Sequence, residues 1–164
     1  MDMDKNYSAL FEPMKIGKLE IKNRLVVPAM DSHYTDENHQ FTNQALNYYG
    51  ERALGGFGLI TTEFLCVSEE GLAEKTQAGI YDDCFIPMLT KLTQRVHENG
   101  SYIFAQLQHS GRLQGKGTTK LPAVGASNIP DVSKPNTIHE LTTEEIPVII
   151  DKFVASALRA KKAG

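Results

Sequence analysis

Gln106 is the residue of this chain that most directly suggests a binding site. It lies in residues 103–107, an apolar run that turns polar over residues 108–110 and then breaks at Gly111. Such a run is typical of a buried strand whose carboxyl end opens onto a site. A buried amide without hydrogen-bond partners costs about 1–3 kcal/mol. Gln106 therefore pairs with a bound group or with the backbone of a neighbouring strand.

Two earlier apolar runs end in residues that could face the same kind of site. Residues 23–30 contain a continuous apolar run after a basic residue, and Asp31 follows it. Residues 57–62 form a second run, which ends at Glu63 and Phe64. Runs without polar alternation predict strands that are buried on both faces, as in parallel sheets.

Helical patterns follow each of these strands. Thr42 is a candidate N-cap for a helix over residues 43–54. Pro87 fits the first turn of a second helix, and Thr142 with Glu145 predicts a capping box for a third. The segments outside this alternation are an irregular lead-in at 7–13, a hairpin over 14–21, and loops over 31–41, 66–83 and 111–136.

Composition narrows the class of protein. The chain has 164 residues, a net charge of −3 and 41% hydrophobic residues, as in ordinary globular proteins. The mild acidity argues against nucleic acid or an anionic membrane as partner. No apolar run approaches the roughly 20 residues of a membrane span. Cys66 and Cys84 lack metal-type spacing, so no metal site and a reducing, cytoplasmic location are predicted.

Three strand–helix repeats predict an α/β fold with a parallel sheet. A closed (β/α)8 barrel needs about 250 residues, and the chain has 164. The predicted fold is therefore the amino-terminal part of a (β/α)8 barrel, about three βα units after a leading hairpin. Residues 1–164 are expected to stop before a fourth strand. The open sheet edges predict that the chain is a fragment, or that it pairs with another copy or partner.

Several polar residues have simpler structural interpretations. His109 and Arg112 could contact a substrate or a phosphate, but bonds to the following loop are the preferred interpretation. Glu69 and Glu70 are interpreted as a solvated pair of charges. The cysteines are interpreted as small buried apolar residues.

Four short motifs together resemble the old yellow enzyme-like NADH:flavin oxidoreductases. The resemblance begins near residue 9 and continues in order to the end of the chain, and it is strongest to the 2,4-dienoyl-CoA reductase and bile-acid oxidoreductase-like branch. The motifs are those at residues 10–26, 48–63, 106–112 and 141–146. The third of them matches the pattern Q-L-x-H-x-G-R.

The resemblance implies a barrel that holds FMN at the carboxyl ends of its strands. NADH or NADPH would reduce the flavin, which would then reduce an unsaturated carbonyl or enoyl substrate. The Gln106 amide would bond the pyrimidine edge of the flavin ring, because it offers a donor and an acceptor side by side. His33 is a candidate substrate-binding residue. The positions that carry over as cofactor-binding are Pro28, Ala29, Met30, Asp31, Phe64 and Gln106.

Some positions depart from the family pattern. Asp31 stands where many relatives have threonine, cysteine or histidine, and its carboxylate would disfavour an anionic reduced flavin unless it is protonated or points away. Phe64 is larger than its counterpart in many relatives. The catalytic residues that bind the substrate carbonyl are expected beyond Gly164. The alternative hypothesis is a non-catalytic half-barrel that self-associates through its open edges and binds no cofactor.

Overall fold

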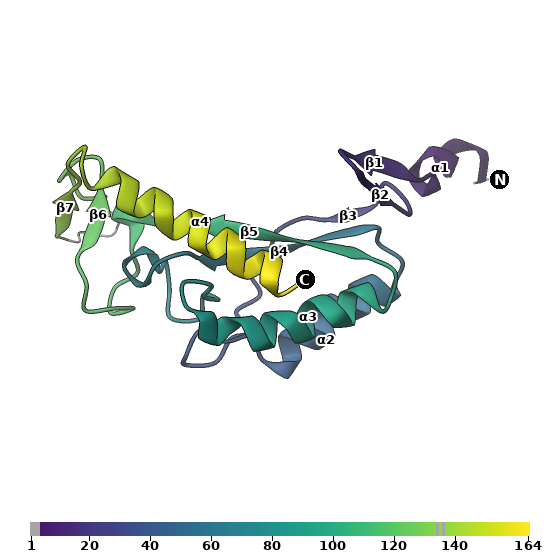
Figure 1. Ribbon diagram of the computed structural model, residues 1–164, viewed down its shortest axis with the longest axis horizontal. Coiled ribbons are helices and arrows are strands. Elements are labelled where there is room, and N and C mark those ends of the chain that lie inside the picture. The colour runs from purple at the N-terminus through teal and green to yellow at the C-terminus, as the bar shows by residue number, and fades with distance from the viewer. Residues whose placement is uncertain (1–3, 134, 136) are drawn as a thin grey trace.

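The centre of the protein is a three-stranded parallel sheet in the order β3-β4-β5. We analysed a computed structural model that describes residues 4–133, 135 and 137–164. The strands are β3 (Val26–Val27), β4 (Leu59–Cys66) and β5 (Tyr102–Gln108). Figure 1 shows them side by side across the middle of the molecule. Their order and parallel direction confirm the predicted β/α alternation.

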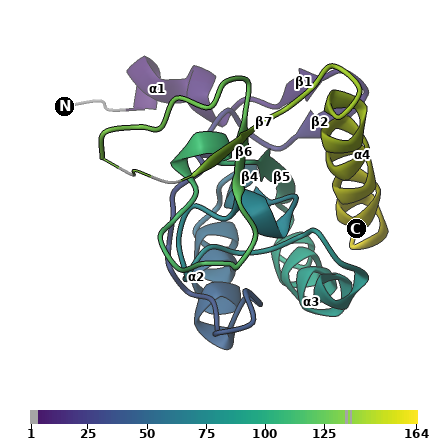
Figure 2. The same cartoon turned by 90° about the vertical axis from the view of Figure 1, so that its left-hand side faces the viewer.

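Three helices cover one side of this sheet. They are α2 (Asn43–Leu54), α3 (Ile86–His97) and α4 (Ile146–Lys162). Seen along the strands in Figure 2, they are arranged around the sheet, with α2 next to α3 and α3 next to α4. The apolar faces of α2 and α3 bury the core because these helices repeat apolar residues at helical spacing. Helix α4 contributes the partly buried Phe153 and Ala160, whereas several of its other apolar side chains are exposed. The central core residues are Val27, Ala45, Tyr49, Ile60, Leu65, Leu92 and Val96.

The segments outside the sheet were predicted only in part. The hairpin of β1 (Met14–Ile16) and β2 (Leu19–Ile21) is confirmed, with Gly17 in the left-handed conformation its turn needs. The predicted irregular lead-in is instead helix α1 (Asp4–Phe11), whose Leu10 carbonyl accepts a 2.8 Å hydrogen bond from the Arg24 N–H. The predicted loop after β5 contains β6 (Ala123–Gly125), which pairs in parallel with β7 (Ile138–Glu140). Short 3-10 turns lie at Glu69–Gly71, Asp83–Phe85 and Gly111–Leu113.

Three elements have boundaries that the apolar runs alone do not give. β3 is only Val26–Val27, shorter than its apolar run, and it ends before Pro28, as expected for a residue without an N–H for the ladder. β4 continues to Cys66, because β5 pairs with it along its whole length. Glu63 and Phe64 therefore lie inside this strand, not after it. Helix α4 begins at Ile146, and only the glutamate half of the predicted capping box forms, from the Thr142 N–H to Glu145 Oε2 at 2.8 Å.

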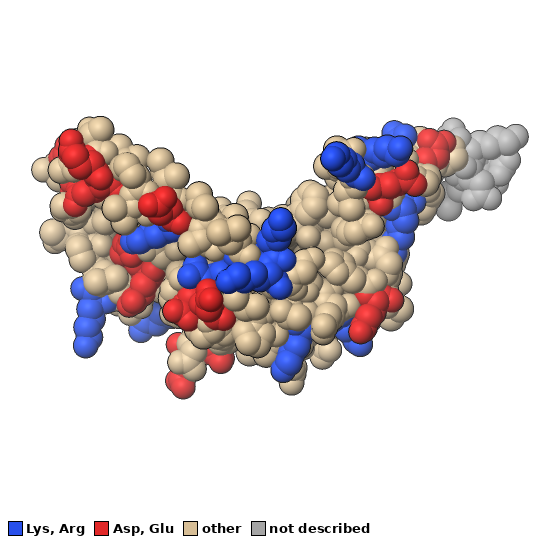
Figure 3. Space-filling view, in the orientation of Figure 1, with Lys and Arg blue, Asp and Glu red and all other residues tan. Residues whose placement is uncertain are grey.

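One face of β5 is open, which contradicts the prediction that this strand is buried on both faces. Tyr102 is 39% exposed and Phe104 is 41% exposed. β5 is an edge strand, and no helix in the described part of the chain covers this face (Figures 1 and 2). In Figure 3 the molecule is hollowed between the end that carries β6 and β7 and the β1–β2 hairpin. None of the helices in the described ranges is long and apolar enough to cross a membrane.

Candidate functional site

A β-bulge brings two of the predicted cofactor-binding residues together. Thr61 pairs with Phe104, but the next pair is Phe64 with Gln106, so β4 has one more residue than β5 between these pairs. Bulges of this kind redirect side chains and are frequent beside active sites. Here the bulge sets Phe64 directly across from Gln106. Residues in register on neighbouring strands project to the same face, so both lie on the open face of the sheet.

Thr62 holds the bulge in place. Its hydroxyl oxygen accepts a 3.1 Å hydrogen bond from the Gln106 N–H. The same hydroxyl donates to the Glu63 carbonyl oxygen at 2.8 Å. The side chain thus supplies the acceptor that the backbone of β4 cannot offer at the bulge. This fixes the backbone of Gln106 while its side chain remains unconstrained.

The two glutamines of the Q-L-x-H-x-G-R motif have different environments. Gln108 accepts a 2.8 Å hydrogen bond from Gln77 Nε2 and donates a 3.0 Å bond to Ser110 Oγ, so its amide is engaged in the fold. The Gln106 side chain is exposed and makes no hydrogen bond within the described residues. The prediction that its amide is buried is therefore wrong, because β5 is an edge strand. Gln106 remains an amide with both donor and acceptor available on the open face.

The segment that follows β3 is joined to the same region by Ser32. The Ser32 N–H and hydroxyl both donate to Glu63 Oε2, the former at 2.9 Å. Glu63 directly precedes Phe64 in β4. Of the predicted positions in this segment, Pro28 and Met30 are exposed, whereas Ala29 and Asp31 are half-buried. The predicted cofactor-binding residues lie in the segment after β3, in β4 and in β5. The structure thus places them on neighbouring segments of the sheet.

Glu63 is the main residue of this region that the sequence prediction left without a role. Its side chain is 1% exposed, and its backbone N–H donates a 2.8 Å hydrogen bond to the Tyr49 hydroxyl. Burial raises the pKa of Glu63, while the hydrogen bonds from Ser32 oppose this shift. An acidic residue at the end of an apolar run is the sequence signal that marks it.

His33 lies close to two acidic residues. Its backbone has a φ of 56°, which is uncommon for a residue with a Cβ. Its Nδ1 lies 2.8 Å from Thr76 Oγ1 and 3.5 Å from Glu74 Oε2. Its Nε2 lies 3.8 Å from Asp31 Oδ2. The imidazole is thus held beside the segment that carries the predicted cofactor-binding residues.

Glu70 is buried, which contradicts its interpretation as a solvated charge. Its carboxylate is paired with Lys152 of α4 and lies 3.9 Å from His109 Nε2. Interaction with His109 and the bond from Lys152 hold the pKa of Glu70 well below its usual range, against the opposing effect of burial. His109 Nδ1 accepts a 3.0 Å hydrogen bond from the Gly111 N–H, as expected for a bond to the following loop. These three residues link helix α4 to the carboxyl end of the sheet.

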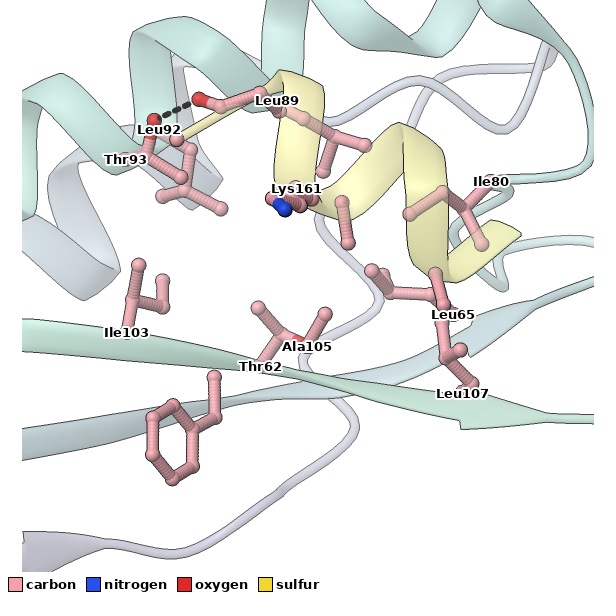
Figure 4. Close-up of a pocket in the computed structure, with 15 residues that line it drawn as sticks. Thr62, Leu65, Ile80, Leu89, Leu92, Thr93, Ile103, Ala105, Leu107 and Lys161 are labelled. Atoms are coloured by element: carbon pink, nitrogen blue, oxygen red, sulfur yellow. Dashed lines mark hydrogen bonds between the residues drawn. The ribbon is translucent and has the colours of Figure 1, made fainter. Parts of the chain in front are cut away.

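The other side of the sheet holds an apolar cavity of about 410 Å³ between the strands and helices α3 and α4 (Figure 4). Ile103, Ala105 and Leu107 of β5 line it, whereas Gln106 does not. At one end of the cavity, the Thr93 hydroxyl donates to the Ala163 carbonyl oxygen. The lining offers few polar groups, so this cavity is distinct from the open face that carries the candidate site.

A parallel sheet with helices on one side and an open face on the other is the arrangement of part of an α/β barrel, and comparison with known proteins defines the family. Residues 9–164 match the NADH:flavin oxidoreductase / NADH oxidase family, and the chain belongs to it. It is 40% identical over 157 residues to the metal reductase of Desulforamulus reducens and 38% identical over 169 residues to the cinnamate reductase of Clostridium sporogenes. The alignments cover 96% and 99% of this chain, but only 23% and 25% of those relatives.

Solved structures of related enzymes have the same fold. The old yellow enzyme homologue from Zymomonas mobilis superposes with a TM-score of 0.86 at 30% identity, over 95% of this chain and 46% of that one. A 2-naphthoyl-CoA reductase superposes with a TM-score of 0.87 at 26% identity, over 96% of this chain and 26% of that one. The predicted fold, an amino-terminal part of a (β/α)8 barrel, is confirmed.

Proposed function

We propose that this chain supplies part of the FMN-binding domain of an oxidoreductase that passes electrons from NADH or NADPH through flavin to an activated alkene. The observation that carries the proposal is the free amide of Gln106, set across from Phe64 on the open face of the sheet. Family membership supports flavin use. Bound flavin supplies hydride-transfer chemistry that no side chain can provide.

The residues of this chain fit a bound FMN. Gln106 would offer its amide N–H and its oxygen to the donor and acceptor atoms of the pyrimidine edge. The backbone of Pro28, Ala29, Met30 and Asp31 would lie along the ring, held in place by the bonds from Ser32 to Glu63. Met30, which is 45% exposed, and Phe64 would provide apolar contact area.

The substrate is proposed to be an unsaturated carbonyl or enoyl compound. Support comes from the names of two similar proteins, a cinnamate reductase and a 2-naphthoyl-CoA reductase. His33, exposed beside the proposed flavin segment, is proposed to contact the substrate. The residues that activate the substrate carbonyl are proposed to lie outside residues 1–164. A cytoplasmic location is part of the same proposal.

The open edge of β5 favours a second candidate, a half-barrel that self-associates and binds no cofactor. Exposed Tyr102 and Phe104 lie on this strand, and an unpaired strand edge is a template for pairing with another chain. The size of the purified chain in solution separates the candidates. A dimer that takes up no FMN supports self-association, and a monomer that binds FMN refutes it.

FMN titration tests the proposed function directly. We expect FMN fluorescence to be quenched when the chain binds FMN. Gln106→Ala should weaken the affinity for FMN about tenfold, because the loss of its hydrogen bonds costs roughly 1.4 kcal/mol of binding free energy. Gln94→Ala, an exposed glutamine on α3, is the matched control and should bind as the unaltered chain does. Equal affinity of the Gln106 and Gln94 variants would refute the role of Gln106.

A further inference from the structure

One buried side chain, Glu63, joins the segment after β3 to strand β4. The backbone ladder between β3 and β4 ends at the pair Val27–Ile60. Beyond this pair, the Ser32 N–H donates to Glu63 Oε2 at 2.9 Å, and the Ser32 hydroxyl donates to the same oxygen. A single carboxylate oxygen thus continues the connection between the two segments where the ladder has ended.

Glu63 is itself firmly held. It lies in the β-bulge of β4, directly before Phe64. Its backbone N–H donates a 2.8 Å hydrogen bond to the hydroxyl of Tyr49 on helix α2. Glu63 and Tyr49 are each 1% exposed. The carboxylate therefore projects from a backbone that is fixed to the core, and Ser32 is bonded to an acceptor that has little freedom to move.

The residues on either side of this link are those assigned to the flavin. Residues 28–31 directly precede Ser32, and Phe64 directly follows Glu63. Binding groups must be held within about 0.5 Å of their productive positions by the residues that support them. The bonds from Ser32 to Glu63 are a support of this kind, because they connect the two flavin-facing segments through one buried group.

The ionised form of Glu63 suits this role. Hydrogen bonds to a charged acceptor are roughly twice as strong as those to a neutral one, so protonation would weaken both bonds from Ser32. Burial raises the pKa of Glu63, and the charge of Asp31 acts in the same direction, whereas the bonds from Ser32 and the nearby His33 oppose the shift. From helix α2, the group that faces Glu63 is the Tyr49 hydroxyl. Glu63 therefore takes up its proton at a higher pH than an ordinary glutamate.

We propose that Glu63 is a positioning residue of the flavin site, whose carboxylate holds residues 28–31 in place relative to strand β4 by way of Ser32. The inference rests on the proposed function, and it assigns Glu63 no contact with the flavin itself. It adds a dependence on charge. Since an ionised carboxylate makes the link, acidification should loosen residues 28–31 and weaken the binding of FMN.

Hydrogen–deuterium exchange of the flavin-free, full-length chain tests the positioning role without any cofactor. Glu63→Gln removes the charge, and Ser32→Ala removes the hydroxyl donor while the backbone N–H remains. Both variants should raise amide exchange over residues 29–32 several-fold, as peptide mass spectrometry would show. Glu70→Gln is the matched control, because it neutralises another buried glutamate that is not bonded to this segment. It should leave exchange over residues 29–32 unchanged.

FMN titration tests the consequence for the flavin. At neutral pH, Glu63→Gln should bind FMN about tenfold more weakly than the unaltered chain, and Ser32→Ala should also bind it more weakly. This difference should shrink as the pH is lowered towards 4.5, the ordinary pKa of a glutamate, because the unaltered Glu63 then becomes neutral as well. His33 and the FMN phosphate titrate in both proteins, so their effects cancel in the ratio of affinities.

Three results would overturn the proposal: unchanged exchange over residues 29–32 in both variants, unchanged FMN affinity in Glu63→Gln, or an affinity ratio that does not vary with pH. The last result would assign Glu63 a structural role alone. If the unaltered chain takes up no FMN, the proposed function fails. Exchange then still decides whether Glu63 holds the segment, since raised exchange in the variants supports this role and unchanged exchange refutes it.

Discussion

Replacing Lys152 by methionine tests how strongly helix α4 is attached to the carboxyl end of the sheet. Lys152 is paired with the buried carboxylate of Glu70, which lies on a turn after β4. Methionine keeps the length and apolar stem of lysine but removes the charge. The Glu70 carboxylate would then keep His109 as a neighbour and lose its cation.

The expected loss of stability in Lys152→Met follows from the burial of Glu70. A hydrogen bond to a charged group contributes about 1.5–3 kcal/mol, and Lys152→Met should lower the free energy of unfolding by this amount at neutral pH. Lys162→Met is a control on the same helix. Lys162 lies 3.8 Å from Asp83, and both side chains are more than 60% exposed. An exposed pair of this kind contributes at most about 1 kcal/mol.

The pH dependence provides a second readout. The pKa of Glu70 is lower in the folded protein than its ordinary value of 4.5. Glu70 therefore adds stability above about pH 4.5, and this contribution disappears as the pH falls through the lower folded pKa. Glu70→Gln removes the titrating group, so the loss of stability on acidification should be smaller in this variant than in the unaltered chain.

Urea unfolding, followed by far-UV circular dichroism, measures these effects at pH 7 and at acidic pH. The reasoning is refuted if Lys152→Met and Lys162→Met unfold at the same urea concentration. It is also refuted if Glu70→Gln shows the acid dependence of the unaltered chain. A double-mutant cycle of Glu70→Gln with Lys152→Met isolates the coupling between the two residues.

Two further predictions concern packing and thiol chemistry. A methyl group added at Gly71 would lie 2.7 Å from His109 Cδ2, so Gly71→Ala should destabilise the protein by about 1–3 kcal/mol in urea unfolding; an unchanged midpoint would show that the imidazole can move aside. Burial raises the pKa of Cys66 to about 12, whereas Cys84 is exposed. Iodoacetamide should therefore label Cys84 in the folded protein and Cys66 only after unfolding, as peptide mass spectrometry would show; equal labelling would contradict this.

Much of the fold could be predicted because its elements are encoded locally. The apolar run before Gln106, the helical spacing over residues 43–54 and the Gly17 turn each depend on a few neighbouring residues. The prediction of an irregular lead-in was wrong, because nothing in residues 7–13 alone signals a helix. The end of this helix is held by a hydrogen bond from the Arg24 N–H. The predicted end of β4 was also wrong, because the length of a strand depends on its partner strand.

The candidate site was predicted as a set of positions without an arrangement. The motif around Gln106 identified the strand end, and the run before Asp31 identified a second segment. How they meet depends on the bulge at Thr62 and on the bonds between Ser32 and Glu63. These contacts join residues that are distant in the chain, so local patterns carry no information about them.

The sequence by itself determined the order of strands and helices, the family resemblance and the position of Gln106 at a strand end. Periodicity and short motifs contain this information because they reflect interactions between near neighbours. Only the tertiary structure decided that Gln106 is exposed, that Glu70 is buried and paired, and that Ser32 is bonded to Glu63. Burial and pairing depend on which segments of the chain pack together. These contacts form only when the sheet and its helices assemble.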